Sequence, residues 1–270
     1  MTLEELVRLS LEEDVGSGDV TTNSCVPTES RSKGWIEARQ VLIVSGMTAA
    51  AEVFRQMDVE FEALVSDGDT VQPMQRIASI SGSSRAMLTG ERLALNFLMR
   101  LSGIATHTAK AVAAAQGRLQ VVDTRKTTPL HRRLEKDAVR HGGAKNHRFA
   151  LYDAVLIKDN HIQAAGGVAA AVNNAQAAAP SLRVQCEVET LAQLQEAIDA
   201  GADSVLLDNM TNDELSQCVR LANGRVETEA SGGMTPERIE GLVDIGLDRV
   251  SVGGVIHQAR WVDLALEFAE

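Results

Sequence analysis

The chain has 270 residues and a formal net charge of −11 at pH 7, from 26 Lys and Arg and 37 Asp and Glu. This acidic balance and an aromatic content of only 3% disfavour general nucleic-acid binding, which needs a basic surface and stacking side chains. The 44% hydrophobic and 23% charged content is typical of a globular protein with one large or two ordinary domains.

Helices and strands are mixed in the first part of the chain. Residues 3–14 place apolar side chains at helical spacing, 34–46 are typical of a strand, and 47–57 are typical of a helix. Residues 59–82 predict two or three strands, with the turn signal DGD between them. This order of elements is an α+β pattern.

A long helical segment follows. Residues 89–116 have a helical pattern, which allows two helices that meet near Gly103. We place the domain boundary at this glycine, with a first domain over 1–103 and a second domain over 104–270.

Strand-like and helical segments alternate after Gly117. Six apolar, β-rich segments are expected to be strands: residues 119–123, 154–159, 183–189, 204–209, 225–233 and 249–254. Strands that alternate with helices predict a parallel sheet with right-handed crossovers. Because six units are too few for the usual eight-stranded barrel, we expect an α/β fold with an incomplete (β/α) TIM-like barrel, or an open doubly wound sheet as the alternative.

Two features bear on the compartment. The N-terminal residues MTLEELVRLSLEED lack the basic and apolar regions of a signal peptide, and no run approaches the roughly 18 apolar residues that span a bilayer. Cys25, Cys186 and Cys218 form no CxxC pair, which argues against a disulfide framework or a zinc site. We therefore expect a cytoplasmic protein with no membrane contact.

A basic window lies inside this acidic chain. Between Arg125 and Lys158 there are nine Lys and Arg against three acids, about +6, which leaves about −17 for the other residues. We expect this window to bind a small, multiply charged anion, with Arg125, Lys126 and Arg148 as candidates because they follow strands or glycine turns. Four other cations are interpreted as a solvated helix face that pairs with nearby acids: Arg132, Arg133, Lys136 and Arg140.

The carboxyl ends of the expected strands carry further candidates, because chemistry gathers at that edge of a parallel sheet. Two glycine loops, at 230–233 and 251–254, suit a phosphate, since glycine lets backbone N–H groups approach it. Glu187 and Asp208 end neighbouring strands and suit Mg²⁺, ribose hydroxyls or a developing positive charge. Ion pairs with cations of the basic window are an equally weighted alternative for these two carboxylates.

The chain resembles the quinolinate phosphoribosyltransferase family in the segments DTRKTTP, GGAKNHR, LYDAVLIKDNHI, CEVET, LLDN, ASGG and SVGG. The segments EEDVGSGDVTT and GERLALNFLMRLSGIAT extend the likeness upstream, so it covers nearly the whole chain. It implies an N-terminal α/β sandwich domain, a C-terminal incomplete barrel of roughly seven strands, and a C-terminal tail, VDLALEFAE, that packs on the first domain. It also implies transfer of phosphoribosyl from 5-phosphoribosyl-1-pyrophosphate to quinolinate with decarboxylation, which gives nicotinate mononucleotide, pyrophosphate and CO₂ in de novo NAD biosynthesis.

The same resemblance implies a role for each candidate residue. Quinolinate would be bound by the following side chains, the first of them reaching from the neighbouring subunit: Arg92, Arg125, His147, Arg148 and Lys158. Phosphoribosyl pyrophosphate would be bound by Lys126, His161, Glu187, Asp208, Ser231, Gly232, Gly233, Gly253 and Gly254. Lys126, Glu187 and Asp208 would be catalytic, and the two carboxylates would also hold Mg²⁺. A homodimer would be the minimal active unit, with a hexamer as the larger alternative.

Two places depart from the family pattern. Leu130 and His131 follow KTTP, where the family usually has glycine, and Lys145 stands before NHR. We expect these changes to alter loop conformation or affinity and to leave the chemistry intact.

Two other functions compete with this reading. A nicotinate phosphoribosyltransferase handles one carboxylate and releases no CO₂, and the density of cations after Asp123 favours a dicarboxylate instead. A non-catalytic anion-binding protein, like the molybdenum-transport relatives of this fold, would lack the KDNH segment that this chain retains at 158–161.

Overall fold

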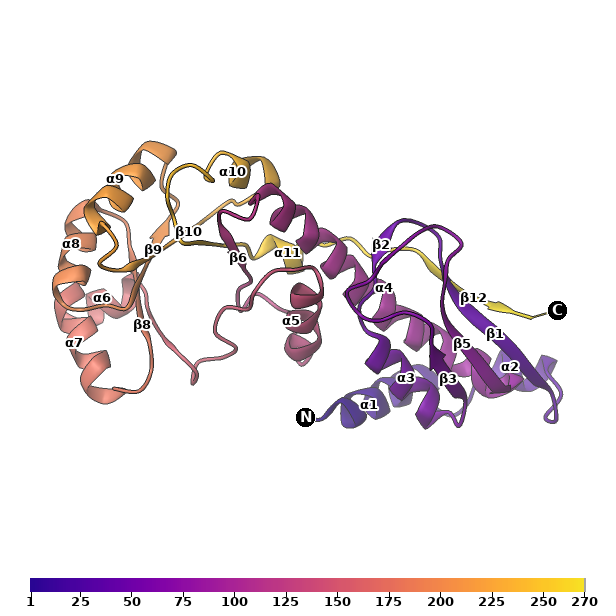
Figure 1. The fold of residues 1–270 in the computed structure, drawn as a ribbon. Helices are drawn as coiled ribbons and strands as arrows, with labels where there is room; N and C mark the ends of the chain where they lie inside the picture. Colours follow the sequence, from indigo (N-terminus) through magenta and orange to yellow (C-terminus); the bar gives the residue numbers. More distant parts are fainter. Residues whose placement is uncertain (270) are drawn as a thin grey trace. The chain divides into compact units, whose positions relative to one another are not determined.

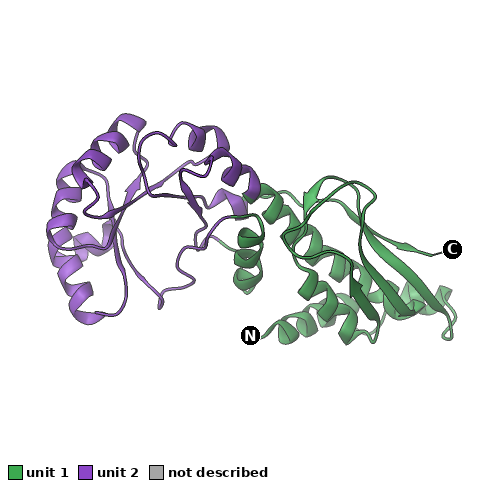
Figure 2. Ribbon diagram, viewed as in Figure 1, with its two compact units in different colours: residues 1–108, 127–143, 258–270 green, residues 109–126, 144–257 purple. Residues whose placement is uncertain are grey.

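The computed structural model describes residues 1–269, which form two compact units (Figure 2). Unit 1 is assembled from residues 1–108, 127–143 and the C-terminal segment that begins at 258, and unit 2 from residues 109–126 and 144–257. The domain boundary near Gly103 stays a prediction. Glu270, the last residue of the expected tail, lies outside the described residues.

Unit 1 contains a four-stranded antiparallel sheet, paired in the order β12 (Leu264–Phe268), β1 (Arg31–Ala38), β5 (Arg76–Ser83) and β3 (Glu60–Ala63) (Figure 1). β12 comes from the C-terminal segment and runs antiparallel to β1, with Leu264 opposite Ala38 and Phe268 opposite Gly34. A two-stranded sheet pairs β2 (Leu42–Ile43) with β4 (Thr70–Val71). One strand was predicted over residues 34–46, whereas the structure divides this segment between β1 and β2.

Within the described part of unit 1, four helices lie wholly inside the unit: α1 (Leu3–Val15), α2 (Val20–Cys25), α3 (Met47–Gln56) and α5 (Arg132–His141). The predicted helices at 3–14 and 47–57 are confirmed by α1 and α3. α1 begins where the Thr2 hydroxyl accepts the backbone N–H of Glu5 at 3.1 Å, an N-cap that satisfies a free donor of the first turn. Phe54 of α3 is fully buried in one apolar cluster with Ile36 and Ile77 of the sheet, so helix and sheet share a core.

A single helix, α4 (Ser84–Ala114), occupies the segment in which the sequence allowed two helices. The two-helix arrangement is therefore wrong. Gly103 has another use, because a Cβ at this position would lie 2.2 Å from the carbonyl oxygen of Arg260. Glycine lets the C-terminal segment cross the helix at close range, and it does not break the helix. None of the described helices combines the length and apolarity needed to cross a bilayer.

Unit 2 is built on a parallel sheet, paired in the order β6 (Gln120–Val122), β11 (Arg249–Ser251), β10 (Glu227–Ser231), β9 (Ser204–Asp208), β8 (Val184–Val188) and β7 (Val155–Ile157). Each strand lies inside a predicted segment, and the parallel pairing confirms the α/β interpretation. Among the described residues, the further strand implied by the resemblance is represented only by a parallel bridge between Val122 and Lys145. β6 and β7 are the two edges of the sheet, so the barrel is incomplete.

Helices follow the strands of unit 2: α6 (Asp159–Ala165), α7 (Val168–Ala178), α8 (Leu191–Asp199), α9 (Asn212–Ala222), α10 (Pro236–Glu240) and α11 (Gly254–His257). α7, α8 and α9 lie along the outer side of the curved sheet (Figure 1). Threonine hydroxyls accept backbone N–H groups at the starts of α8, α9 and α10, so each strand-to-helix turn is short and well defined. Because the strands are parallel, the loops at their carboxyl ends gather on one edge of the unit.

The interpretation of α5 as a solvated basic face is wrong for part of the helix. Lys136 is 2% exposed and Glu135 is 1% exposed, and the Glu135 carboxylate pairs with Arg100 of α4 at 2.8 Å. The pair between Arg140 and Asp137 matches the surface arrangement that the charges predicted. The buried side of the helix therefore carries two charged residues, Glu135 and Lys136, and the charge of Glu135 is neutralised by Arg100.

Candidate functional site

A pocket of about 580 Å³ lies in unit 2 at the carboxyl ends of its strands. It brings together ten of the predicted site residues: Arg125, Lys126, His147, Arg148, Lys158, Glu187, Asp208, Ser231, Gly232 and Gly233. The basic window and the strand-end carboxylates, which are far apart in sequence, thus line one cavity. Their individual roles stay predictions.

The register of the sheet explains why the acidic and polar side chains converge. Side chains alternate between the two faces of a strand, and in-register neighbours on adjacent strands share a face. Glu187 lies opposite Leu206, Leu206 lies opposite Glu229, and Asp208 lies opposite Ser231. All five residues line the pocket. Neighbouring parallel strands therefore contribute two layers of side chains to the cavity.

Asp123, at the end of β6, holds the segment that carries two of the candidates. Its buried carboxylate accepts the amide of Asn146 at 2.8 Å and the backbone N–H of His147 at 2.7 Å. Arg148 follows directly, and its guanidinium donates to the carbonyl of Ala154 at 3.1 Å. The conformation of this connection is therefore set by a buried charge next to the pocket.

The cations of the pocket are placed at an electrostatic cost. Burial is the larger cause that lowers the pKa of Arg148, and the neighbouring Arg125 guanidinium lowers it further, with a smaller opposing effect from Asp153. Two like charges that repel each other in a concave site would be relieved by a bound anion. Lys126 and Lys158 add two more cationic side chains to the same cavity.

The two predicted carboxylates have different surroundings. Glu187 forms an ion pair with Lys158, with Oε2 and Nζ 2.6 Å apart, so the alternative of an ion pair is confirmed for this residue. Asp208 accepts the side-chain amide of Asn209 at 2.6 Å and a hydrogen bond from the Ser231 hydroxyl. Among the described residues, no group of three His, Cys, Asp or Glu side chains could hold a metal. Two carboxylates still fit Mg²⁺, which is usually bound by one or two carboxylates together with substrate phosphates.

The first glycine loop needs its glycine at one position. Gly232 has φ +95°, and a Cβ there would lie 2.0 Å from the amide oxygen of Asn209. The backbone N–H of Asn209 donates to the Ser231 carbonyl at 3.0 Å, which joins the ends of β9 and β10. A side chain at 232 would separate these two loops, both of which line the cavity.

Some predicted residues lie outside the lining of this pocket. Gly253 is adjacent to it, since a Cβ there would lie 3.2 Å from Lys126 Cδ, and Gly254 is the first residue of α11. His161 uses Nδ1 to accept the backbone N–H of Lys158 at 2.9 Å and so caps α6. Arg92 lies on α4 in unit 1, with a side chain that is 61% exposed.

The pocket also contains residues that the sequence analysis did not select: Thr124, Leu156, Leu206, Asn209, Glu229 and Ser251. A signal for several of them was present. Residues two positions apart in a strand point to the same face. Leu206 therefore shares a face with the predicted Asp208, and Glu229 shares a face with the predicted Ser231. His257 lies beside the second glycine loop, because its Nε2 would lie 3.2 Å from a Cβ at Gly253.

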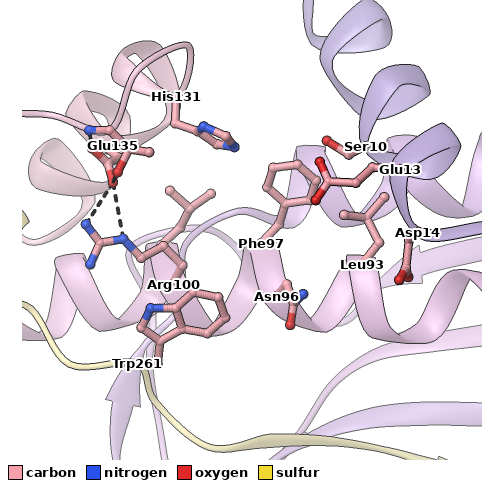
Figure 3. A pocket seen from close by; sticks show the side chains of 12 residues that line it. Ser10, Glu13, Asp14, Leu93, Asn96, Phe97, Arg100, His131, Glu135 and Trp261 are labelled. Carbon is pink, nitrogen blue, oxygen red and sulfur yellow. Dashed lines mark hydrogen bonds and ion pairs between the residues drawn. The ribbon is translucent and has the colours of Figure 1, made fainter.

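A second cavity, of about 340 Å³, lies in unit 1 beside α4 (Figure 3). Phe97, Trp261 and His131 line it, next to the ion pair between Arg100 and the buried Glu135. The Glu135 carboxylate also accepts the backbone N–H of Thr128 at 2.8 Å and its hydroxyl at 2.9 Å. This network anchors the KTTP turn to α5.

Leu130, one of the departures from the family pattern, stands in that turn with φ +67° and is 71% exposed. A left-handed conformation costs a residue with a Cβ roughly 1–2 kcal/mol, part of which glycine would offset by its greater freedom in the unfolded chain. We expect Leu130→Gly to raise the free energy of unfolding by about 0.5–1 kcal/mol in urea titrations. Leu130→Ala keeps the Cβ and should give no gain; equal stabilisation by both variants would contradict the strain.

The fold and the pocket together define a class, the α/β-barrel proteins with a cationic ligand pocket at the strand ends. Comparison with known proteins is more specific. The model of the quinolinate phosphoribosyl transferase C-terminal domain matches residues 104–267, and that of the N-terminal domain matches residues 19–102. The chain belongs to the quinolinate phosphoribosyl transferase family.

Individual relatives agree with the family models. A Bacillus subtilis (strain 168) protein named probable nicotinate-nucleotide pyrophosphorylase (carboxylating) is 39% identical over 99% of this chain and 93% of its own length. A Nicotiana tabacum protein named quinolinate phosphoribosyltransferase (decarboxylating) 1b is 36% identical over 98% of this chain and 82% of its own length. The solved structure of nicotinate-nucleotide pyrophosphorylase from Francisella tularensis is 38% identical, with a TM-score of 0.95 over 99% of this chain and 96% of that chain.

Proposed function

We propose that this chain transfers phosphoribosyl from 5-phosphoribosyl-1-pyrophosphate to quinolinate with decarboxylation, giving nicotinate mononucleotide, pyrophosphate and CO₂ for NAD biosynthesis. The observation that carries the proposal is a single pocket that combines four Lys and Arg side chains, two strand-end carboxylates and a glycine loop. The names of relatives at 36% and 39% identity agree with this reaction.

Quinolinate is a dianion, and the cationic side of the pocket suits it. Arg125 and Arg148 would each hold a carboxylate through parallel N–H donors, with Lys158 beside them and His147 next to Arg148. The repulsion between the two guanidinium groups would be replaced by attraction to the ligand. A monocarboxylate would offset less of that charge, which favours quinolinate over nicotinate.

Phosphoribosyl pyrophosphate would occupy the rest of the cavity. Its 5′-phosphate would bind the backbone of the glycine loops at Ser231, Gly232, Gly233, Gly253 and Gly254. Lys126 and His161 would lie near the pyrophosphate, and Glu187 and Asp208 near the ribose. The same two carboxylates would hold Mg²⁺, which when bound stabilises negative charge on the leaving pyrophosphate.

The proposed reaction has two steps, phosphoribosyl transfer and decarboxylation. The ring nitrogen of quinolinate bonds to the anomeric carbon as the bond to pyrophosphate breaks, and the positive charge that develops on the ribose is stabilised by Glu187 and Asp208. The 2-carboxylate then leaves as CO₂, and the electron pair of the broken bond stays on the ring carbon beside the cationic nitrogen. Lys126 or water supplies the proton that this carbon takes up.

The proposed activity is tested with quinolinate labelled at the 2-carboxylate, together with Mg²⁺ and phosphoribosyl pyrophosphate. We expect labelled CO₂ that depends on both substrates and equals the nicotinate mononucleotide formed. Turnover of nicotinate without CO₂ would replace this proposal with a nicotinate phosphoribosyltransferase. A thermal shift with molybdate and none with either substrate would favour the anion-binding protein.

We also propose a homodimer in which Arg92 reaches the partner's pocket, because this side chain is 61% exposed and its ion pair with the adjacent Glu91 is long, at 3.9 Å. Arg92→Ala and Arg148→Ala should each be nearly inactive, and mixed dimers should regain one intact site. Random mixing of equal amounts should restore about a quarter of the sites. No recovery in a mixture whose heterodimers are demonstrated would place Arg92 in its own subunit's site. The cytoplasmic location and the hexamer stay predictions.

A further inference from the structure

Glu229 is a buried carboxylate in the middle of β10 to which the proposed reaction gives no role. Glu229 is 0% exposed, and its Oε2 accepts hydrogen bonds from Arg249 Nε at 2.5 Å and from Gln185 Nε2 at 2.9 Å. Burial alone would raise the pKa of Glu229, whereas a hydrogen bond from His147, the positive charge of Arg249 and the Gln185 amide lower it. The carboxylate is therefore ionised at neutral pH and held by donors from two other strands.

The hydrogen bonds of Gln185 fix the orientation of its side-chain amide. Because its Nε2 donates to Glu229, its Oε1 is the atom that faces His147, with 3.0 Å between Oε1 and Nε2 of the imidazole. Glu229 Oε1 lies 3.5 Å from the same imidazole nitrogen. Gln185 Oε1 and Glu229 Oε1 are both acceptors, so the imidazole nitrogen that faces them carries a proton.

The other ring nitrogen has the opposite requirement. His147 Nδ1 lies 2.7 Å from the backbone nitrogen of Arg148 and accepts its N–H. A nitrogen that accepts a hydrogen bond cannot carry a proton, so the imidazole is neutral with its proton on Nε2. The two observations are independent and select the same tautomer.

We propose that Glu229 is a positioning residue: with Arg249 and Gln185 it holds His147 as the neutral Nε2–H tautomer, whose Nδ1 fixes the backbone of Arg148. Glu229 acts through its neighbours, since it sits two positions before Ser231 on β10, below the strand-end layer of the pocket. Its effect on quinolinate binding rests on the proposed function. The tautomer of His147 does not.

The matched test compares Glu229→Gln with Glu227→Gln. Glu227 lies two positions earlier on the same strand and pairs with Arg183 at 2.6 Å and with Arg249 at 3.4 Å. Both variants remove one carboxylate from this network, but only Glu229 faces His147. Removing the Glu229 charge leaves the positive charge of Arg249 without this partner, which can prevent folding. The double variant Glu229→Gln/Arg249→Gln removes both charges and replaces the single variant in the test if the single variant does not fold.

The first readout is the ¹⁵N spectrum of the free protein labelled at its six histidines, with the His147 signals assigned from His147→Gln. We expect the Nε2–H pattern for His147 in the wild type and in Glu227→Gln, and its loss in Glu229→Gln or the double variant. A wild-type His147 that carries its proton on Nδ1, or on both nitrogens, would overturn the proposal whether or not the protein turns over quinolinate.

The second readout is steady-state kinetics. Removing a partner that orients a binding side chain is expected to raise the KM for quinolinate about 10-fold, with kcat and the KM for phosphoribosyl pyrophosphate changed about 2-fold at most. An unchanged quinolinate KM in Glu229→Gln would contradict the positioning role. Absence of turnover in the wild type would reject the proposed function, and the ¹⁵N spectrum would still decide the tautomer.

Discussion

Arg148→Ala is expected to raise the KM for quinolinate about 100- to 1,000-fold. Removing one partner of a buried, charge-assisted carboxylate contact costs roughly 3–4 kcal/mol, and each 1.4 kcal/mol is a factor of ten. The free protein should lose little stability, because burial and repulsion from Arg125 already disfavour the charge of Arg148. Urea unfolding should therefore be nearly unchanged while quinolinate saturation, measured by initial rates, moves far to higher concentration.

Two further variants separate charge from geometry at this position. Arg148→Lys keeps a positive charge but lacks the planar pair of donors, so we expect it to recover only part of the affinity. Arg118→Ala is the control, since Arg118 is an arginine of unit 2 that pairs with Asp244 and is 57% exposed. It should leave the KM unchanged. Near-normal quinolinate kinetics in Arg148→Ala would remove this residue from the binding site.

The strands of unit 2 could be predicted because their sequence signal is local. Each is a short apolar run that ends in a charged or glycine-rich turn, and parallel pairing then brings the strand ends to one edge. This is why Glu187, Asp208 and Ser231 could be placed together before their contacts were known. The likeness to known sequences added the roles, which spacing alone left open between a metal site and ion pairs.

Other features depend on contacts between distant parts of the chain, which have no local signal. Gly103 was interpreted as a break between helices, but the close approach of the Arg260 carbonyl explains it. Lys136 was assigned to a solvated face from its charge, yet it is buried, and its neighbour Glu135 is neutralised by Arg100, 35 residues away. A charged residue inside the protein can be recognised only once its partners are known.

Glu187→Gln tests the proposed transition-state role and has the second large expected effect. The substitution keeps the shape of the side chain and removes the charge that would stabilise a cationic ribose. We expect kcat to fall about 100- to 1,000-fold, the range seen when one preorganised electrostatic contact to a transition state is removed. The control is Glu189→Gln, because Glu189 is an exposed carboxylate just beyond the same strand, and it should leave kcat unchanged.

Quinolinate should bind Glu187→Gln at least as tightly as it binds the wild type. In the free protein Glu187 is paired with Lys158 at 2.6 Å, so a carboxylate of quinolinate must compete with Glu187 for that ammonium group. Without the Glu187 charge, Lys158 is available to the ligand, and the dissociation constant for quinolinate, measured by calorimetry, should stay equal or fall. A variant that binds quinolinate as well as the wild type but turns it over far more slowly separates the two roles. Weakened binding with an unchanged kcat would instead make Glu187 a residue that positions Lys158 for the substrate.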